Sequence, residues 1–375
     1  MKTSILFPRL TILLMGLILN SCTKESGLKK IEKLSAADCP RVASLSVVKK
    51  EALYTVSTFA GEDNIYNYIL VDGTICKARF GAPTGIAISK DGTIYISDNS
   101  FHDIRKISNK GIVSTIAGDN GGGTYCQGDD DGTGQEAQLC VPSKLVIDKD
   151  GNLIFIDQGG SPYRALRKAF PSGLVSTIIG RYRDEGYKDG PLLKARFNYF
   201  ATVAIGSDGS IFLYEGNNLV RRLSLTGTTV STFAGQKPEN GVIQKGYRDG
   251  PKDNALFGWI RDMAFGPDGS LYLCDFYINK KIRRVTKTGM VETFADVDAS
   301  SITISDKGIV YVANGYKIFR IDADGMVTTV AGGDTSGYKN GVGSEARFRG
   351  IRNMAIYNNY LYITDGSTIR RMTIE

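Results

Sequence analysis

Ser231–Gly235 reads Ser-Thr-Phe-Ala-Gly, and close variants of this stretch occur six times along the chain. The six copies end at Gly61, Gly118, Gly180, Gly235, Asp296 and Gly332. Successive copies lie about 60 residues apart, except for the last interval, which is 36 residues. Self-similarity at a period of this order is typical of an array of supersecondary units that pack against one another. The chain is therefore predicted to have a repeat architecture.

Each interval contains four short β-type runs separated by turns. In the first interval these runs cover residues 85–89, 93–97, 104–107 and 112–117. The first and second runs are separated by Asp91-Gly92, and the third and fourth runs by Lys110-Gly111. Glycine in these turns permits the positive φ that tight hairpin turns need. Four short strands with regular turn signals predict one antiparallel sheet in each interval.

The first and last units are incomplete, and each supplies what the other lacks. Tyr54–Gly61 is a fourth strand with no sheet before it, whereas the chain ends soon after a third strand at 369–372. Pairing these segments would close a ring and cover both free sheet edges. The sequence thus predicts an all-β fold, a six-bladed β-propeller with four-stranded antiparallel blades. We expect one domain over residues 51–375, closed by the N-terminal strand on the last blade.

The repeat unit resembles the NHL repeat. Phe80–Ile107 contains Phe-x-x-Pro-x-Gly-Ile-Ala, then Asp-Gly-x-Ile-Tyr-Ile-x-Asp, then Ile-Arg-Lys-Ile. The resemblance covers roughly residues 54–372 and implies an NHL-type propeller, similar to exported Bacteroidetes NHL-repeat proteins. It leaves the function open, because NHL propellers include enzymes, sensors, RNA binders and scaffolds.

The N-terminal residues carry an export signal rather than part of the fold. Residues 1–21 combine Lys2 and Arg9 with an apolar run at 10–19, which is typical of a signal peptide. Leu19–Cys22 resembles a bacterial lipobox, so Cys22 is predicted to be lipidated and residues 22–50 to form a linker. The alternative is an ordinary signal peptide with a chance cysteine. Because several acyl chains anchor firmly, we expect an outer-membrane lipoprotein on the periplasmic or cell-surface side.

The charge balance argues against a polyanion-binding protein. The chain has 46 Lys and Arg against 39 Asp and Glu, a net charge of +7, and no basic block. Such a mixed surface is not that of a nucleic-acid binder, so no nucleic-acid partner is expected.

Five cysteines remain besides Cys22, an odd number that leaves at least one unpaired within the chain. Cys126 and Cys140 bracket one loop and are predicted to form a disulfide in an oxidising compartment. Cys274 lies in an apolar strand and is expected to be a core residue. The pairing of Cys39 and Cys76 stays open. The sequence contains no CxxC pair, so a structural zinc site is not expected.

Propeller topology places the long loops on one face and the Asp-Gly turns on the other. The long loops share an Asp-Gly (once Asn-Gly) followed by an Ala-x-Phe or Ala-x-Leu element, interpreted as a turn and an apolar plug. The residues that differ between these loops are mainly aromatic, and aromatic rings with polar groups are well suited to bind a sugar or a peptide. These residues are Tyr66, Tyr68, Tyr125, Tyr182, Tyr187, Tyr199, Tyr247, Trp259 and Tyr338.

Acids and arginines recur at fixed places in the blades. Second strands end in Asp98, Asp157, Glu215, Asp275, Asn314 and Asp365, and third strands carry Arg105, Arg167, Arg221, Arg283, Phe319 and Arg370. Since buried charges are usually paired, a ring of acid–arginine pairs is expected. The alternative is a divalent cation such as calcium on the axis, as in gluconolactonase-like propellers. Its weak candidate ligands are Glu215, Asp262, Asn353 and Asp98.

The expected binding site lies at the axial mouth of the loop-bearing face. An aromatic ring beside mixed charges at a concave mouth is the usual make-up of a small-ligand or peptide site. The candidates are Trp259, Arg261, Asp262, Lys144, Arg352 and Asn353. The competing interpretation is that Trp259 merely plugs a blade interface.

His102 is the only histidine, so no nucleophile–histidine–acid set is assigned, and no catalytic residue or cofactor is expected. The leading hypothesis is a membrane-anchored, non-catalytic binding or scaffold protein for a glycan, peptide or protein partner. A metal-dependent lactonase- or lyase-like enzyme and a purely structural component of a surface complex are the alternatives.

Overall fold

The computed structural model describes residues 52–63, 69–118, 128, 130–159, 164–180, 186–216, 218–239, 241–276 and 278–374. These residues belong to one compact unit, Pro40–Glu375. The predicted signal peptide, the linker, Cys22, Cys39 and Cys126 lie outside the described residues. No helix within these ranges is long and apolar enough to cross a membrane.

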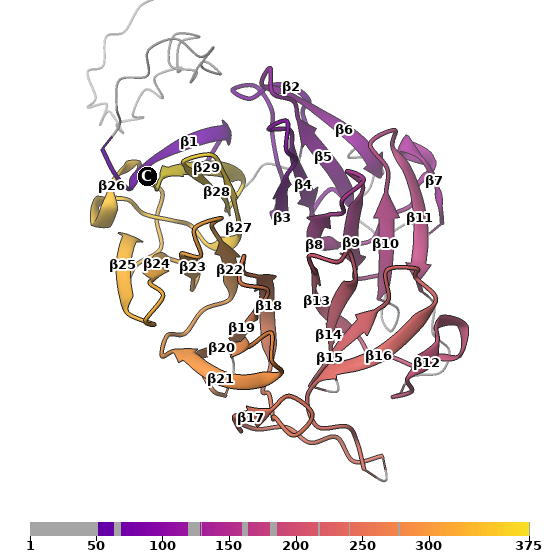
Figure 1. The fold of residues 1–375 in the computed structure, drawn as a ribbon. Helices are drawn as coiled ribbons and strands as arrows, with labels where there is room; N and C mark the ends of the chain where they lie inside the picture. Colours follow the sequence, from indigo (N-terminus) through magenta and orange to yellow (C-terminus); the bar gives the residue numbers. More distant parts are fainter. Residues whose placement is uncertain are drawn as a thin grey trace, which may run out of the picture. The chain divides into compact units, whose positions relative to one another are not determined.

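Six antiparallel sheets follow one another along this unit (Figure 1). The first strands are β3 (Pro83–Ile88), β8 (Pro142–Ile147), β13 (Phe200–Ile205), β18 (Ile260–Phe265), β22 (Ser301–Ile304) and β27 (Ile351–Tyr357). The second strands are β4 (Ile94–Asp98), β9 (Leu153–Asp157), β14 (Ile211–Glu215), β19 (Leu271–Asp275), β23 (Val310–Ala313) and β28 (Tyr360–Asp365). The third strands are β5 (Asp103–Ile107), β10 (Ala165–Ala169), β15 (Leu219–Leu223), β20 (Lys281–Val285), β24 (Lys317–Ile321) and β29 (Thr368–Thr373). The fourth strands are β6 (Ile112–Gly118), β11 (Leu174–Ile179), β16 (Thr229–Ala234), β21 (Met290–Ala295), β25 (Val327–Gly332) and β1 (Thr55–Gly61).

The six sheets form a closed six-bladed propeller. Each first strand contacts the first strand of the next blade, in the order β3, β8, β13, β18, β22, β27 and back to β3. The N-terminal strand β1 pairs antiparallel with β29, with Val56 opposite Met372 and Gly61 opposite Thr368. The predicted closure of the last blade by the N-terminal strand is therefore confirmed.

Five blades differ from the four-stranded prediction by one short outer strand. These strands are β2 (Gly73–Thr74), β7 (Gly132–Thr133), β12 (Gly190–Pro191), β17 (Gly250–Pro251) and β26 (Gly341–Val342). Each begins at the glycine of the repeated Asp-Gly or Asn-Gly pair and lies against the outer edge of a fourth strand, as where Gly73 faces Val113. Three loops continue into a single 3₁₀ turn: η1 (Gly134–Glu136), η2 (Leu192–Lys194) and η3 (Gly343–Glu345). The blade β22–β25 has four strands, because the link before it is too short to add one.

The repeated Ser-Thr-Phe-Ala-Gly stretch forms a β-bulge. In β16, Thr232 faces Arg221 and Ala234 faces Val220, so Phe233 has no partner on the third strand. The same register shift occurs in all six blades. A bulge adds local twist to a strand pair, so the stretch that defines the sequence period also sets the curvature of every outer edge.

The core lies between blades, where both faces of each sheet are buried. One cluster combines Phe212 and Tyr214 of one blade with Met263 and Leu273 of the next. The loop plugs predicted from Ala-x-Phe contribute to it, since Phe257 has no exposed surface. Burying a large apolar side chain stabilises a fold by about 1.5–3 kcal/mol, so the loops add directly to the packing between blades.

Candidate functional site

Five buried arginines occupy the third strands, and four of them make the predicted pairs with second-strand acids. Arginine–carboxylate distances are 2.9 Å to Asp157, 2.6 Å to Glu215, 3.1 Å to Asp275 and 3.0 Å to Asp365, from Arg167, Arg221, Arg283 and Arg370 respectively. The exception is Arg105, which pairs with Asp72 at 2.6 Å. Asp98 instead accepts hydrogen bonds from the backbone N–H groups of Gly81 and Ala82.

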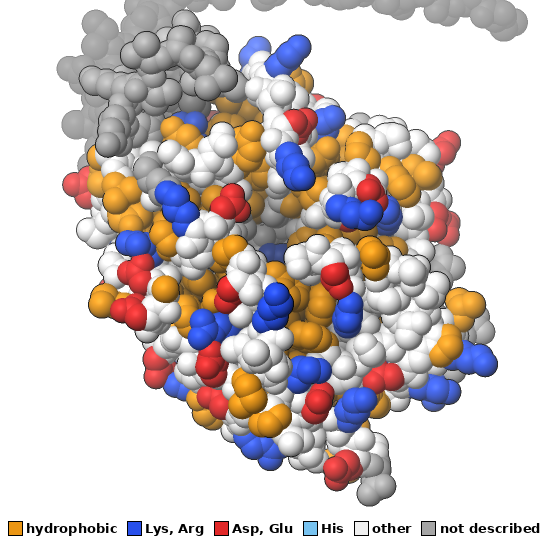
Figure 2. Space-filling view, in the orientation of Figure 1, with side chains coloured by type: hydrophobic (Ala, Val, Ile, Leu, Met, Phe, Trp, Pro, Cys, Tyr) orange, Lys and Arg blue, Asp and Glu red, His pale blue; other side chains and the backbone are white. Residues whose placement is uncertain are grey.

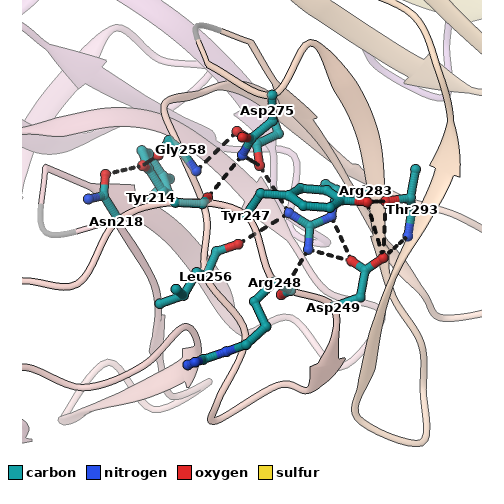
Figure 3. A network of polar contacts seen from close by, with 12 residues as sticks. Tyr214, Asn218, Tyr247, Arg248, Asp249, Leu256, Gly258, Asp275, Arg283 and Thr293 are labelled. Carbon is teal, nitrogen blue, oxygen red and sulfur yellow. Dashed lines mark hydrogen bonds and ion pairs between the residues drawn. The ribbon is translucent and has the colours of Figure 1, made fainter.

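Each arginine also fastens a long loop to its blade. Arg283 lies between Asp275 and Asp249 and donates to the carbonyl groups of Leu256 and Arg248, while the Tyr247 ring lies across its guanidinium (Figure 3). The distance from the guanidinium carbon to the ring centre is 4.6 Å. We call this repeated arrangement the arginine anchor. In the Arg283 anchor every guanidinium nitrogen has an acceptor, which indicates a structural role.

Three aromatic residues expected to decorate the binding face belong to these anchors instead. Tyr187, Tyr247 and Tyr338 stack on Arg221, Arg283 and Arg370 and bond to fourth-strand threonines. These contacts give the three rings a structural role in the anchors. The overlooked signal is the pattern Gly-Tyr-basic-Asp/Asn-Gly at 186–190, 246–250 and 337–341.

The pKa values of the inner and outer carboxyl groups of the anchors are shifted in opposite directions. Burial raises the pKa of Asp275, against the lowering effect of Asn279 and Arg283. Burial likewise raises the pKa of Asp365, where hydrogen bonding by Gly350 and the charge of Arg370 act in the opposite direction. The pKa of the outer carboxyl Asp189 is lowered: burial raises it, but hydrogen bonds from Thr232 and the charge of Arg221 prevail. Burial is therefore the largest influence on the pKa of these two inner carboxyl groups.

Three of the six predicted site residues meet at the centre of the ring. Lys144 Nζ lies 2.9 Å from Asp262 Oδ1 and 3.4 Å from Asn353 Oδ1, although the three side chains come from β8, β18 and β27. Asn353 Nδ2 also donates to Asp262, at 3.1 Å. We call these three residues the axial cluster.

The Asp262 carboxylate has further partners and is only 2% exposed. It accepts hydrogen bonds from the Thr202 hydroxyl and from the backbone N–H groups of Met263 and Ile302. The cluster thus ties together first strands from five blades and carries no net charge. Its polar atoms satisfy one another, so it forms a floor rather than an open binding site.

The other three predicted residues lie exposed beside this floor. Trp259 is 40% exposed, whereas Phe257 is the buried plug of the same loop. The structure therefore contradicts the interpretation that Trp259 plugs the blade interface. Arg261 is exposed and stacks on Phe276 at 5.0 Å, and Arg352 is exposed.

Tyr199, one of the aromatic residues expected on the binding face, and Arg164, which the sequence analysis did not name, extend this surface. The Tyr199 ring lies 5.5 Å from the Trp259 ring with an interplanar angle of 33°. Arg164 lies over the other side of the tyrosine, 4.8 Å from its centre, and donates to the Phe200 carbonyl at 2.6 Å. Tyr199 and Trp259 each follow a plug phenylalanine by two residues, which is the signal that pairs them. We call Arg164, Tyr199, Trp259, Arg261, Phe276 and Arg352 the mouth surface.

The space-filling view shows one face of this unit, hollowed near its centre, with Lys and Arg as well as Asp and Glu side chains around the hollow (Figure 2).

The weak metal-ligand candidates are each engaged by the protein. Glu215 pairs with Arg221, Asp262 with Lys144, and Asp98 with two backbone N–H groups. Among the described residues, no group of three or more His, Cys, Asp or Glu side chains is arranged to hold a metal ion. The donor set therefore does not fit a calcium site with several free carboxylates.

The histidine and cysteines have structural surroundings. His102 is 8% exposed, and its Nδ1 accepts a hydrogen bond from the Val141 N–H of the next blade. Cys274 is a buried free thiol whose pKa is raised by burial. Cys76 and Cys140 are both disulfide-bonded. Because Cys126 lies outside the described residues, its pairing with Cys140 stays a prediction.

Comparison with known proteins places the repeats among NHL sequences. Residues 71–126 match the family model of the teneurin NHL domain. Teneurin-m of Drosophila melanogaster is 26% identical over 234 residues, which are 57% of this chain and 8% of the relative. NHL repeat-containing protein 2 of Bos taurus is 26% identical over 223 residues, 57% of this chain and 29% of the relative. The chain therefore spans less than a third of either relative.

A solved propeller of similar fold covers more of the chain. An auxiliary nutrient binding protein from Bacteroides thetaiotaomicron superposes with a TM-score of 0.59 at 16% identity, over 84% of this chain and 75% of that one. At this identity the likeness concerns the fold alone.

Proposed function

This chain is an NHL-repeat β-propeller, and we propose that it is a non-catalytic binding protein whose ligand site is the mouth surface. The observation that carries the proposal is the exposed stack of Trp259 on Tyr199 with Arg164 and Arg261 beside it. Exposed rings next to charged groups at a concave mouth have the composition of a small-ligand or oligomer site. The nutrient-binding role of the Bacteroides propeller named above is compatible with this proposal.

The axial cluster supports a binding role by closing the floor of the mouth. A ligand resting there would meet a rigid, neutral surface, because Lys144, Asp262 and Asn353 already satisfy one another. A preformed site avoids the entropic cost of ordering side chains on binding. The lactonase- or lyase-like alternative has less support, since its candidate ligands Glu215 and Asp98 have other partners.

The proposal includes attachment to a membrane through a lipidated Cys22. It is motivated by the signal-like residues 1–21 and the lipobox resemblance at Leu19–Cys22. An outer-membrane anchor would hold the propeller where glycans, peptides or partner proteins are encountered, on the periplasmic or the cell-surface side.

The test uses the single tryptophan as a reporter. The mature protein is screened against arrayed oligosaccharides and peptides, and each hit is titrated while tryptophan emission is recorded. We expect emission to change with saturation, and Trp259→Ala to weaken binding at least tenfold with an unchanged urea midpoint. Hits that bind Trp259→Ala as tightly as the parent would show that the site lies elsewhere.

A further inference from the structure

The arginines of the mouth surface have no carboxylate partner among the described residues. Arg261 and Arg352 are exposed, and neither makes a hydrogen bond or ion pair with the described residues. Among the described residues, Arg164 donates only to the Phe200 carbonyl. Burial lowers the pKa of Arg164 from its ordinary value, yet an arginine keeps its charge at neutral pH.

Three carboxylates of the blades that carry these residues are paired with other cations. Asp275 and Glu215 end the second strands of the blades that carry Trp259 and Tyr199, and both are fully buried against their own anchor arginines. Asp262, next to Arg261 in the chain, is neutralised by Lys144. Among the described residues, the arginines of the mouth surface are therefore left without a paired carboxylate, although the charges of the whole sequence are nearly balanced.

Resting on the proposed function, we propose that the ligand is an acidic oligosaccharide, built of hexuronate residues. One pyranose ring of this ligand would lie on the exposed face of Trp259, and the single carboxylates of successive residues would pair with Arg164, Arg261 and Arg352. A pyranose has an apolar C–H face that matches a flat aromatic surface. A guanidinium presents parallel N–H donors that match a carboxylate bidentately.

The stacking of the arginines on rings favours this geometry. Arg164 lies over Tyr199 and Arg261 over Phe276, at 4.8 and 5.0 Å. A guanidinium held over a ring has restricted freedom, so less side-chain entropy is lost on binding. An acidic peptide is the less favoured ligand, because an extended backbone gains most from pairing with a sheet edge and the mouth presents ring faces.

The test is calorimetric titration of the mature protein with three probes of equal length: tetragalacturonate, maltotetraose and tetraglutamate. We expect tetragalacturonate to bind, and its affinity to fall at least fivefold between 25 and 300 mM NaCl, because salt screens exposed charges. Arg261→Gln and Arg352→Gln should each weaken it about tenfold, the effect of losing roughly 1.4 kcal/mol. The matched control is Arg222→Gln, an exposed arginine that pairs with Asp208 of a hairpin turn, and it should bind like the parent.

Three outcomes would overturn the assignment. If maltotetraose bound as tightly as tetragalacturonate and Trp259→Ala abolished this binding, the mouth surface would remain the site but the ligand would not be an acidic oligosaccharide. Tighter binding of tetraglutamate would assign an acidic peptide. Tetragalacturonate binding that Arg261→Gln, Arg352→Gln and Trp259→Ala all leave unchanged would reject the class and the mouth site together.

Discussion

Replacement of Arg283 by methionine tests whether the anchors hold the fold. Methionine keeps most of the apolar stem but leaves Asp275, which is fully buried, without its cation. It also removes the donors to the Leu256 and Arg248 carbonyl groups. Removing one partner of a buried ion pair costs about 3–5 kcal/mol, so we expect Arg283→Met to lose stability in that range.

The loss of stability caused by Arg283→Met should increase with pH. Burial already raises the pKa of Asp275 above 3.8 in the folded protein, and loss of the Arg283 charge would raise it further. A carboxyl whose pKa is raised by folding stabilises the folded state when protonated, and this contribution is lost as the pH rises through the folded pKa. The destabilisation by Arg283→Met should thus be largest at neutral pH and shrink as the pH falls towards 4.

Urea unfolding at pH 7.5 and pH 4.5 measures both effects. The matched control is Arg284→Met, since Arg284 follows in the same strand, remains partly exposed and pairs with Glu292. Exposed pairs contribute about 0–1 kcal/mol, so this control should change little at either pH. The reasoning would be refuted if Arg283→Met cost no more than Arg284→Met, or if its cost were the same at both pH values.

Four further predictions concern backbone conformation at glycines, the axial cluster, the lipid attachment at Cys22 and the closure of the ring by β1. Gly118→Ala should lower the stability measured by thermal unfolding by roughly 2–3 kcal/mol, because φ is +104° and the new Cβ would lie 2.4 Å from a carbonyl oxygen. The control Gly134→Ala, which has open space around it, should lower stability by about 1 kcal/mol. Equal losses in the two variants would contradict this prediction. Lys144→Met should lower stability by about 3 kcal/mol by leaving a buried carboxylate without its cation, and an unchanged urea midpoint would show that the axial cluster adds nothing. Cys22→Ser should release the protein from the membrane fraction, and unchanged lipid labelling would rule out the lipobox. Deletion of Tyr54–Gly61 should expose the edge of β29 and cause aggregation; a soluble monomer with an unchanged melting profile would mean that closure does not depend on β1.

The number of blades and the closure of the ring could be predicted because both depend on local signals. Hairpin turns and apolar runs repeat in register, and the two incomplete units, Tyr54–Gly61 and residues 351–372, leave one way to close. The short strands β2 and β7 could not be predicted, since two residues in a loop carry no periodicity. They form because an arginine from a third strand holds the loop in place, as Arg105 holds Asp72, a contact between residues far apart in sequence.

The candidate site was predicted in part. Lys144, Asp262 and Asn353 stand at equivalent places in three first strands, which is why the sequence brings them to the axis. Their mutual hydrogen bonds depend on side-chain lengths across the ring, which no local pattern encodes. Arg164 was missed for the same kind of reason: it lies in a loop between second and third strands whose sequence is not repeated in the other blades, and its partner Tyr199 comes from the next blade.

The most direct test of the account is a crystal structure of the protein soaked with its tightest-binding probe. The account predicts difference density for the ligand stacked on Trp259, within hydrogen-bonding distance of Arg261 or Arg164. Density on the outer loops around Tyr187 or Tyr247, or on the face of the Asp-Gly turns, with the mouth surface left unoccupied, would contradict it.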